Sequence, residues 1–388
     1  MTAESSVEAE HRIRLGMVGG EHGAFIGAVH RFAARLDGEF ELVAGALSSD
    51  PDRALASGRA LGIPVDRTYG SFVEMAGREA KRPDGIEAVA IVTPNHMHFA
   101  PAKLFLEAGV HVICDKPLTA TLDEAEELAR IARRSGKLFV LTHNYTGYPM
   151  VRQARAMIAS GQVGEVRVVQ AEYAQDWLTE RAEDGGSKQA EWRTDPRRSG
   201  AGGCIGDIGT HAYNLVSFVT GLELESLCAD LSALVPARAL DDNAHVLLRF
   251  GGGARGMLWA SQVAVGNENR LVLRVYGTKG GLEWSQEQPD QLWYTPYGRP
   301  RQMITRNGSG ADDASRRVSR IPAGHPEGYL EAFANIYAEA ARAVRAARNG
   351  TTRDPDVVFP TVEDGVKGVA FVDACVRSSA GGASWISV

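Results

Sequence analysis

The segment from Ser199 to His211 holds two side chains suited to proton transfer. It reads SGAGGCIGDIGTH, and a helical pattern follows it as far as Gly221. In a helix, Asp207 and His211 would lie on one face, because they are four residues apart. A histidine beside a carboxylate can take up a proton near neutral pH. The alternative is a helix N-terminal aspartate next to a histidine whose hydrogen bonds are satisfied within the core.

Polar residues also follow two predicted strands in the N-terminal half. Residues 91–98 read IVTPNHMH and residues 113–119 read ICDKPLT. Ligands of parallel α/β sheets bind at the carboxyl ends of the strands. A proline keeps the residue before it extended, so Lys116 is predicted outside the next helix, with its ammonium along the sheet edge. A single Lys-Pro would favour an exposed lysine, but two such strand ends favour a ligand site.

A glycine-rich turn follows the first predicted strand, Ile13–Val18. Residues 19–27 read GGEHGAFIG and precede a helical segment. Glycines let the backbone approach a pyrophosphate, and free N–H groups at the helix start stabilise its charge. Gly19 and Gly27 are eight positions apart rather than five, so a turn that binds nothing is the alternative. A carboxylate at Glu21 would repel a pyrophosphate, and we therefore expect Glu21→Gly to tighten cofactor binding.

The end of the second predicted strand bears on the choice of dinucleotide. An acid normally contacts the ribose hydroxyls of NAD about 20 residues after the glycines. Here the chain reads Ser48-Ser49-Asp50-Pro51, with serines where the acid is expected. NAD with serine contacts stays open, as does NADP with Ser48, Ser49 and Arg53 around its 2′-phosphate. The alternative for Asp50 is a turn and helix start.

Short apolar runs alternate with amphipathic stretches between Ile13 and Asn144. This alternation is typical of parallel strands covered on both faces by helices. A capping box at residues 121–124 marks one helix start, and Gly136 suits its end. We predict an α/β, doubly wound parallel sheet of Rossmann type over residues 13–143, after a flexible tail of residues 1–12. The predicted strands are Ile13–Val18, Phe40–Leu47, Ala88–Thr93, Val110–Cys114 and Leu138–Thr142.

The pattern changes after Asn144, which predicts a second domain of α+β type over residues 144–388. Glycine-containing turns separate β-branched stretches, as in a large, open and mostly antiparallel sheet. Long polar stretches at Leu178–Gly203 and Pro300–Gly324 are expected to serve binding or assembly. The predicted elements are a helix at 148–160, strands at Glu165–Tyr173, Ala244–Phe250, Ala254–Ser261 and Leu271–Tyr276, and a helix at Tyr329–Arg348.

Composition narrows the class of partner. The 388 residues include 42 Lys and Arg against 48 Asp and Glu, for a formal net charge of −6. This balance disfavours nucleic acid and anionic membranes and favours a small molecule or a second copy of the chain. The sequence has neither a signal-peptide pattern nor a long apolar run, so we expect a cytoplasmic location. The four cysteines lack zinc-ligand spacing, so we expect no metal site. We expect the cysteines to be reduced thiols.

In combination, these motifs resemble the glucose-fructose oxidoreductase/inositol dehydrogenase/MocA (Gfo/Idh/MocA) family of NAD(P)-dependent sugar and cyclitol oxidoreductases. The resemblance runs from Ile13 to about Ala380. It departs from the family at Asp115, which replaces the usual Glu, in a glycine loop three residues longer, and in the missing acid after strand two. The matching pieces are Gly27-Ala28-Val29-His30, Thr93-Pro94-Asn95 with His98, Asp115-Lys116-Pro117, Asn144-Tyr145 with Tyr148-Pro149, Trp192-Arg193, Gly202-Gly203 with Asp207 and His211, Asp241-Asp242-Asn243, and Gly277-Thr278-Lys279-Gly280.

The resemblance implies a catalytic set of Lys116, Asp207 and His211 at the domain interface. It also implies a homodimer or homotetramer built through the outer face of the second sheet. Cofactor contacts are expected from Gly19, Gly20, Gly23, Ala24, Phe25, Ile26, Ser48, Ser49, Arg53, Thr93, Pro94, Asn95, His98, Asp115, Lys116, Asn144 and Tyr145. Strand ends and long loops should line the cleft, so substrate contacts are expected from Lys116, Tyr173, Gln175, Trp177, Trp192, Arg193, Asp207, His211, Asp242, Asn243, His325 and Tyr329. For the aromatic residues, ordinary packing is the alternative.

The hypothesis is hydride transfer between NAD, or NADP, and a secondary alcohol of a pyranose sugar, glycoside or cyclitol. His211 would remove the hydroxyl proton, Lys116 would stabilise the alkoxide, and Asp207 would orient His211 or hold a neighbouring hydroxyl. An arginine cluster at 193, 197 and 198 could bind an anionic substituent or simply be solvated. The alternatives are an NAD-dependent glycosidase acting by transient 3-oxidation, elimination, hydration and re-reduction, a nucleotide-sensing regulator, and a metal-dependent hydrolase that lacks a ligand cluster.

Overall fold

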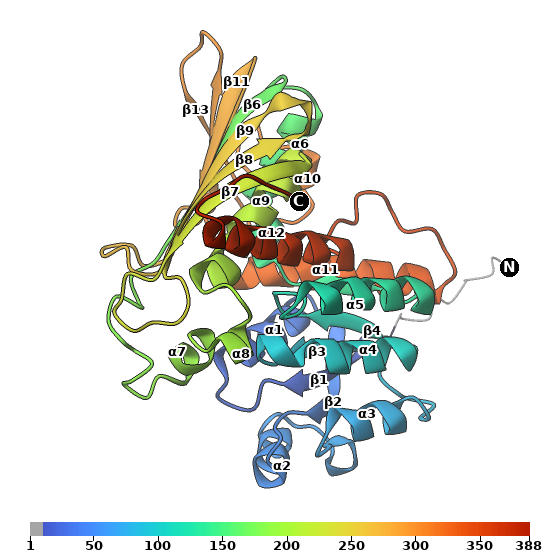
Figure 1. The fold of residues 1–388 in the computed structure, drawn as a ribbon. Helices are drawn as coiled ribbons and strands as arrows, with labels where there is room; N and C mark the ends of the chain where they lie inside the picture. Colours follow the sequence, from blue (N-terminus) through green and yellow to red (C-terminus); the bar gives the residue numbers. More distant parts are fainter. Residues whose placement is uncertain (1–10) are drawn as a thin grey trace, which may run out of the picture.

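The computed structural model describes residues 11–388, and its N-terminal part is a five-stranded parallel sheet in the order β2-β1-β3-β4-β5 (Figure 1). All residues of β3, β4 and β5 are buried, which explains their continuous apolar runs. The strand order changes direction beside β1, the place where open α/β sheets bind ligands. The strands are β1 Ile13–Gly19, β2 Phe40–Ala46, β3 Ala88–Val92, β4 His111–Cys114 and β5 Phe139–Leu141.

Helices connect these strands and bury their apolar faces against the sheet. Thr121 Oγ1 accepts the Glu124 amide at 3.4 Å, and Gly136 ends the same helix in the left-handed conformation, so both predicted boundaries are confirmed. Residues 1–10 of the predicted flexible tail lie outside the described part of the chain. The helices are α1 Phe25–Leu36, α2 Pro51–Ala60, α3 Phe72–Glu79, α4 Phe99–Glu107 and α5 Leu122–Ser135.

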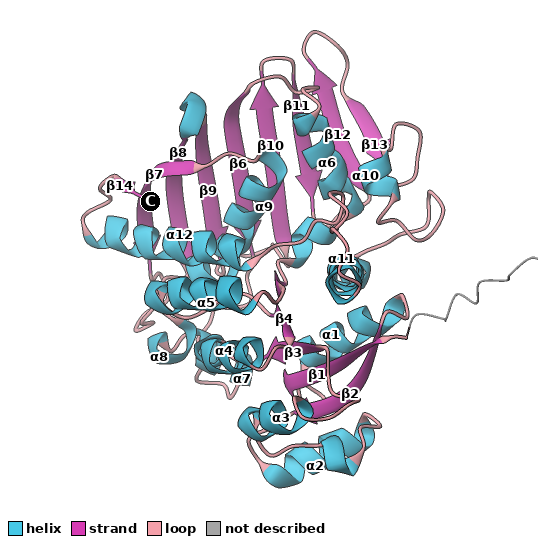
Figure 2. Cartoon of the chain, turned by 90° about the vertical axis from the view of Figure 1, so that its right-hand side faces the viewer, coloured by secondary structure: helices cyan, strands magenta, loops and turns pink. Residues whose placement is uncertain are grey.

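The second part is a nine-stranded sheet in the order β13-β12-β11-β10-β6-β9-β8-β7-β14 (Figure 2). All its strand pairs are antiparallel except β6 with β9. Helices α6 Pro149–Ala159 and α9 Thr210–Thr220 pack on one face and share a core with it. The strands are β6 Val166–Ala174, β7 Leu224–Ser232, β8 Asn243–Phe250, β9 Arg255–Ser261, β10 Arg270–Gly277, β11 Gly280–Ser285, β12 Gln291–Pro296, β13 Gln302–Thr305 and β14 Ile386–Ser387.

The two polar stretches contain more secondary structure than their composition predicted. The first includes α7 Lys188–Arg193 and α8 Pro196–Ser199, and the second includes β13 and α10 Asp313–Arg316. Arg306, in the second stretch, is buried and donates to Asp290 Oδ1 at 2.9 Å. Because this buried arginine donates to carboxylate and carbonyl oxygens, it holds in place a segment whose polar composition predicts a solvated loop.

The last two helices return the chain to the first sheet. In α11 Tyr329–Arg348, Phe333 and Tyr337 share a core with Leu15 of β1 and Val29 of α1. Helix α12 Val362–Ala380 packs between α5 and β7. The proposed division at residue 144 therefore does not follow packing at the C-terminus, because α11 covers the first sheet although it lies in the segment assigned to the second domain.

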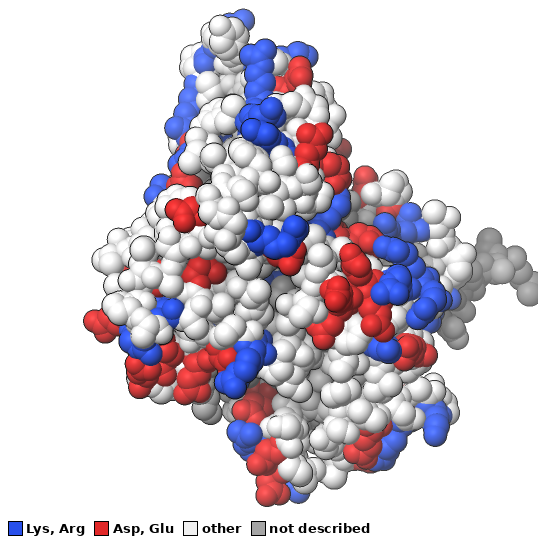
Figure 3. Space-filling model, in the orientation of Figure 1, with Lys and Arg blue, Asp and Glu red and all other residues white. Residues whose placement is uncertain are grey.

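Acidic and basic side chains are interspersed over the face shown in Figure 3. Among residues 11–388, we find no helix with the length and apolar character needed to span a membrane. Nor do three or more His, Cys, Asp or Glu side chains of that range form a group suited to a metal ion. All four cysteines are free thiols, and three of them are buried.

Candidate active site

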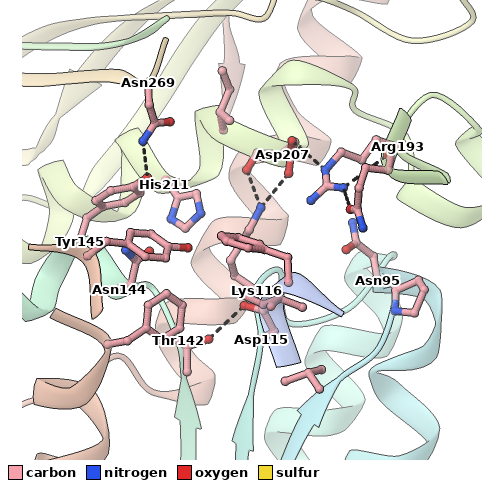
Figure 4. A pocket seen from close by; sticks show the side chains of 18 of the residues that line it. Asn95, Asp115, Lys116, Thr142, Asn144, Tyr145, Arg193, Asp207, His211 and Asn269 are labelled. Atoms are coloured by element: carbon pink, nitrogen blue, oxygen red, sulfur yellow. Dashed lines mark hydrogen bonds and ion pairs between the residues drawn. The ribbon is translucent and has the colours of Figure 1, made fainter. Parts of the chain in front are cut away.

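Lys116 lies just after β4, at the carboxyl edge of the first sheet, and its ammonium is held by one residue of the second part. Nζ donates to Asp207 Oδ1 at 2.8 Å and to the Asp207 backbone oxygen at 2.7 Å (Figure 4). The two side chains are 15% and 13% exposed, so the ion pair is largely shielded from water. Screening by salt is weak for such a pair, and the ammonium is fixed at the junction of the two sheets.

The turn that carries Asp207 is held by the partly buried carboxylate of Asp241. Residues Ile205–Gly209 form one π-helical turn before α9, an arrangement often found at functional sites. Asp241 accepts hydrogen bonds from the Gly203 amide at 2.7 Å and the Ile205 amide at 2.9 Å. A Cβ on Gly203 would lie 2.0 Å from the Asp241 carbonyl oxygen. Asp241 therefore explains why a glycine is needed at position 203, since a side chain there would clash with the Asp241 backbone.

The Asp207 carboxylate is fully engaged. Its second oxygen accepts from Arg193 Nε at 3.2 Å and from Gln262 Nε2 at 2.9 Å. Burial alone would raise the pKa of Asp207, but the charges of Lys116 and Arg193 outweigh it and hold that pKa below its usual value. Within residues 11–388, the structure gives Asp207 no hydrogen bond to His211. Of the two roles expected for Asp207, orientation of His211 has no hydrogen bond behind it among the described residues, and holding a neighbouring substrate hydroxyl stays a prediction.

His211 lies in the first turn of α9 and lines the same cavity as Lys116. Its Nδ1 lies 3.5 Å from Nδ1 of His143, and the two rings meet edge to face at 85°. Tyr145 also meets the His211 ring edge to face, with centroids 4.9 Å apart. Burial, followed by the charge of Lys116, lowers the pKa of His211 well below its ordinary value. The imidazole is therefore neutral and available as a proton acceptor.

A second polar network lines the cavity opposite Asp207. The Tyr145 and Tyr173 hydroxyls are 2.5 Å apart, and Tyr173 donates to Asn269 Oδ1 at 2.8 Å. Gln175 donates to the same oxygen at 2.7 Å. These groups, with Trp192, Arg193 and Tyr329, surround a cavity of about 460 Å³. Hydroxyl and amide groups around a cavity of this size suit a small polyhydroxylated ligand.

Residues 13–154 match the model of an oxidoreductase family with an NAD-binding Rossmann fold, and residues 151–283 match the GFO/IDH/MocA C-terminal domain. An oxidoreductase from Sinorhizobium meliloti is 62% identical over 97% of this chain and 100% of its own, with a TM-score of 0.89. The chain belongs to the Gfo/Idh/MocA family. It is an NAD-dependent oxidoreductase with the predicted fold.

Two relatives of this Gfo/Idh/MocA protein have been solved with ligands. An inositol dehydrogenase homologue from Azotobacter vinelandii, complexed with NAD+, is 39% identical over 97% of this chain and 98% of its own, with a TM-score of 0.93. Another structure of such a homologue holds NADH and myo-inositol. A levoglucosan dehydrogenase complexed with NADH and levoglucosan is 26% identical over 97% of this chain and 99% of its own, with a TM-score of 0.82. The levoglucosan dehydrogenase of Pseudarthrobacter phenanthrenivorans is 26% identical over 97% of this chain and 98% of its own.

The start of α1 fits the pyrophosphate of NAD. Ala24 caps the helix without a side-chain hydrogen bond, and the first turn contains no acidic residue, so free N–H groups remain for an anion. A Cβ on Gly27 would lie 2.5 Å from Gly20 Cα, so this pair allows the helix to meet the loop closely. The longer loop thus keeps the close contact that the standard glycine spacing provides.

The edge of the cavity fits the nicotinamide end of the cofactor. Among residues 11–388, Asn144 Nδ2 is buried and has no hydrogen-bond partner, which leaves a donor for a ligand. Asp115 accepts from Thr142 Oγ1 at 3.1 Å and from the Lys116 amide at 2.9 Å, so the shorter acid is well held. Of the predicted cofactor residues, Ala24, Phe25, Ile26, Thr93, Pro94, Asn95, Asp115, Lys116, Asn144 and Tyr145 line this cavity.

Other predicted cofactor residues lie outside the cavity lining. Gly19, Gly20, Gly23, Ser48, Ser49 and Arg53 belong to the glycine loop and the region after β2, farther along the sheet edge. His98 is fully buried, and its ring nitrogens contact the carbonyl oxygens of Thr93 at 2.8 Å and Pro117 at 2.7 Å. His98 was predicted as a cofactor contact, but it joins the two strand-end loops instead of facing the ligand.

Four predicted substrate residues do not reach the cavity. Asp242 is fully buried and accepts the amides of Leu234 and Val235 together with Arg238, so it closes a loop. Asn243 accepts from Trp259 Nε1 on the sheet. His325 lies in an exposed loop, and Trp177 stands outside the lining beside Arg193. Five other predicted substrate residues do line the cavity together with Lys116, Asp207 and His211, and they are Tyr173, Gln175, Trp192, Arg193 and Tyr329.

The predicted arginine cluster also separates. Arg193 joins Asp207, whereas Arg197 pairs with Asp195 at 3.1 Å and is 86% exposed on its side chain. The Arg198 carbonyl lies 3.3 Å from His96 Nδ1. One arginine of the three therefore lines the cavity, so the structure favours the solvated alternative over an anion site made by the three arginines together. Five further residues line the cavity and were not predicted as site residues: Thr142 at the end of a predicted strand, Ile208 inside the motif that contains Asp207, and Gln189, Asn269 and Phe333 in segments without a distinctive local pattern.

Proposed function

We propose that the protein oxidises a secondary alcohol of a cyclitol or pyranose ring with NAD. The observation that carries this proposal is the pairing of the Lys116 ammonium, fixed by Asp207, with the neutral imidazole of His211 at one cavity. The relatives solved with myo-inositol and with levoglucosan support a ring polyol as substrate.

In the proposed reaction, His211, Lys116 and Asp207 have different roles. NAD, when bound, supplies the hydride acceptor. His211 Nε2 takes the proton of the substrate hydroxyl, because Nδ1 is occupied by His143. Lys116 stabilises the negative charge that develops on the oxygen, and Asp207 holds Lys116 in place. The amides of Gln175 and Asn269 suit neighbouring ring hydroxyls, since both lie at the same cavity.

A turnover screen tests this proposal. Purified protein with NAD+ is incubated with inositol isomers, levoglucosan and simple pyranosides, and reduced nicotinamide is followed by absorbance. We expect net NADH from at least one ring polyol. Glycoside cleavage without net NADH would instead identify a redox-neutral glycosidase. Tight NAD+ binding with no reaction toward any ring polyol would support a sensing role and contradict the dehydrogenase.

We propose that NAD is preferred to NADP because of two carboxylates near the end of β2. Glu21 Oε2 lies 3.8 Å from Arg53 Nε, and Asp50 Oδ2 lies 3.9 Å from the same nitrogen. A 2′-phosphate would meet two negative charges and one positive charge, whereas ribose hydroxyls can donate to carboxylates. Asp50 also caps α2 by accepting the Arg53 amide at 2.9 Å.

Glu21→Gln is expected to strengthen NADP+ binding about fivefold and to change NAD+ binding less. The reason is the loss of about 1 kcal/mol of repulsion between exposed charges. Dissociation constants from titration of protein fluorescence would check this, with Glu126→Gln on α5 as the control. Equal NADP+ affinity in wild type and variant would show that Glu21 does not face the 2′ position. The earlier expectation for Glu21→Gly stays a prediction, with a smaller effect because Arg53 partly neutralises the carboxylate.

We propose a homodimer or homotetramer formed through the outer face of the second sheet. Leu247 on β8 pairs with Met257 on β9, and Val168 on β6 pairs with Tyr276 on β10. These four side chains are 40–53% exposed, so the sheet presents apolar surface that a second copy would cover. Leu247→Asp is expected to shift native mass spectra toward monomer. A monomeric wild type, or an unchanged assembly in the variant, would contradict this interface.

A further inference from the structure

We propose that His143 is the positioning residue of His211, accepting the proton of His211 Nδ1 and so leaving Nε2 free to take the substrate proton. This inference rests on the function proposed above, because it assigns a task to the proposed base. His143 was not among the predicted site residues. It lies two residues after the end of β5 and reaches α9 from the first sheet, so the contact crosses between the two halves of the site.

The backbone around His143 fixes where its ring can lie. The His143 amide donates to the Leu141 carbonyl at 2.9 Å. The His143 carbonyl accepts from the Thr146 amide at 3.1 Å and from Thr146 Oγ1 at 2.9 Å. The His143 and His211 residues are 2% and 8% exposed. Their rings are therefore held against each other, with water largely excluded.

His143 is the partner that remains for His211 after the other polar groups are assigned. Asp207 Oδ1 serves Lys116, and Oδ2 serves Arg193 and Gln262. The Tyr145 hydroxyl points to Tyr173, and its ring meets His211 by an edge contact. In the described part of the chain, the side chain of His211 has one hydrogen-bond partner, which is His143 Nδ1 at 3.5 Å.

The facing Nδ1 atoms couple the tautomers of the two rings. A neutral imidazole carries one proton, so a hydrogen bond between these atoms needs one Nδ1 protonated and the other bare. If His143 donates, His211 carries its proton on Nε2 and cannot act as a base toward the cavity. If His211 donates, its Nε2 is bare and can accept the hydroxyl proton. The proposed chemistry therefore requires His211 as donor and His143 as acceptor.

The contact between His143 and His211 also stabilises His211 after it has taken up the substrate proton. When the hydroxyl proton moves from the substrate oxygen to His211 Nε2, the ring becomes an imidazolium and its Nδ1–H becomes a stronger donor. A neutral His143 then accepts a charge-assisted hydrogen bond. Burial, followed by the charge of Lys116, lowers the pKa of His143 to about 3, so His143 stays neutral and does not compete for the proton.

The test compares wild type with His143→Phe, which removes the acceptor, and with His143→Asn, which can return an oxygen near the Nδ1 position. Protein labelled with 15N-histidine is studied by NMR, with His211 signals assigned by their loss in His211→Ala. We expect the Nδ1–H tautomer of His211 in wild type, mixed tautomers in the Phe variant, and recovery in the Asn variant. Thermal unfolding and NAD+ affinity establish that each variant is folded.

Single-turnover kinetics supply the second readout. The hydride-transfer rate is expected to fall about tenfold in His143→Phe, a part of the factor of about 10² to 10⁴ that a general base contributes. His143→Asn should recover part of the rate, and the substrate KM should change little in either variant. An Nε2–H tautomer in wild type, or a folded Phe variant with unchanged tautomer and rate, would overturn the proposal. Because tautomers are read without substrate, failure of every polyol to react would instead contradict the proposed function.

Discussion

Replacing Lys116 by alanine is expected to lower the rate of hydride transfer about 10²- to 10³-fold. The ammonium is held by two oxygens of Asp207 at the cavity, so in the proposed mechanism it would stabilise the alkoxide without reorganising. Arg193 also lines the cavity, but its guanidinium is directed to Asp207 and Gln189. NAD+ affinity should change far less than the rate, because the glycine loop and α1 remain intact. Stopped-flow measurement of the first turnover checks this expectation.

Lys103→Ala is the matched control for Lys116→Ala. Lys103 lies on α4 and pairs with Glu127 at 3.1 Å, with both side chains about 40% exposed. Exposed pairs of this kind contribute at most about 1 kcal/mol to stability. The control should therefore keep normal kinetics. A Lys116→Ala enzyme whose first turnover stays within about threefold of wild type would remove Lys116 from the chemistry.

Replacing His211 by alanine is expected to lower the same rate about 10²- to 10⁴-fold, because the hydroxyl proton loses its acceptor. The pH profile provides a second signature. Burial, followed by the charge of Lys116, lowers the pKa of His211 well below its usual value, so the base stays unprotonated as the pH falls through about 6.5. Wild type should therefore lose no activity through protonation of His211 between about pH 8 and pH 6.

The control for this variant is His245→Ala. His245 is an exposed residue of β8 in the second sheet, contacts Asn243 at 3.3 Å and lies outside the cavity lining. It should leave both the rate and the pH profile unchanged. Near-normal single-turnover reduction in His211→Ala would contradict the assigned base. A wild-type rate that falls with an apparent pKa near 6.5 would contradict its depressed pKa.

The parts of the site that could be predicted are those encoded by local patterns. Lys116 follows a buried strand and precedes a proline, so its place at the sheet edge follows from the order of residues. Asp207 and His211 lie at a helix start, and their spacing indicates a shared face. That Lys116 lies beside Asp207 and His211 could be predicted only from the resemblance of the whole series of motifs to the family. No local pattern indicates which strand end contacts which helix.

The errors concern buried polar residues whose partners come from distant segments. Asp242 and His98 were predicted to contact ligands. Instead, Asp242 accepts hydrogen bonds from backbone amides of a neighbouring loop, and the ring of His98 contacts backbone carbonyls. The orientation of His211 was assigned to Asp207 because four residues separate them. The π-helical turn and the competing donors Arg193 and Gln262 change that geometry, and neither is visible in the spacing.

Residues such as Asn269 and Gln189 were missed for a different reason. Asn269 lies just before β10, and Gln189 lies in a short helix of the long polar stretch. Neither belongs to a motif, and polar residues are common in such segments. Their role depends on how the second sheet and its loops close over the first. That closure is a property of tertiary packing, to which α11 contributes by returning to the first sheet.

The most direct test of the account follows the hydrogen itself. A ring polyol found active in the turnover screen is labelled with deuterium at its carbinol carbons, and the reduced cofactor is analysed by mass spectrometry after one turnover. Hydride transfer from the ring carbon predicts deuterium on the nicotinamide ring and a slower first turnover with the labelled substrate. Reduced cofactor without deuterium, or substrate conversion with no reduction of the cofactor during the first turnover, would contradict hydride transfer at this site.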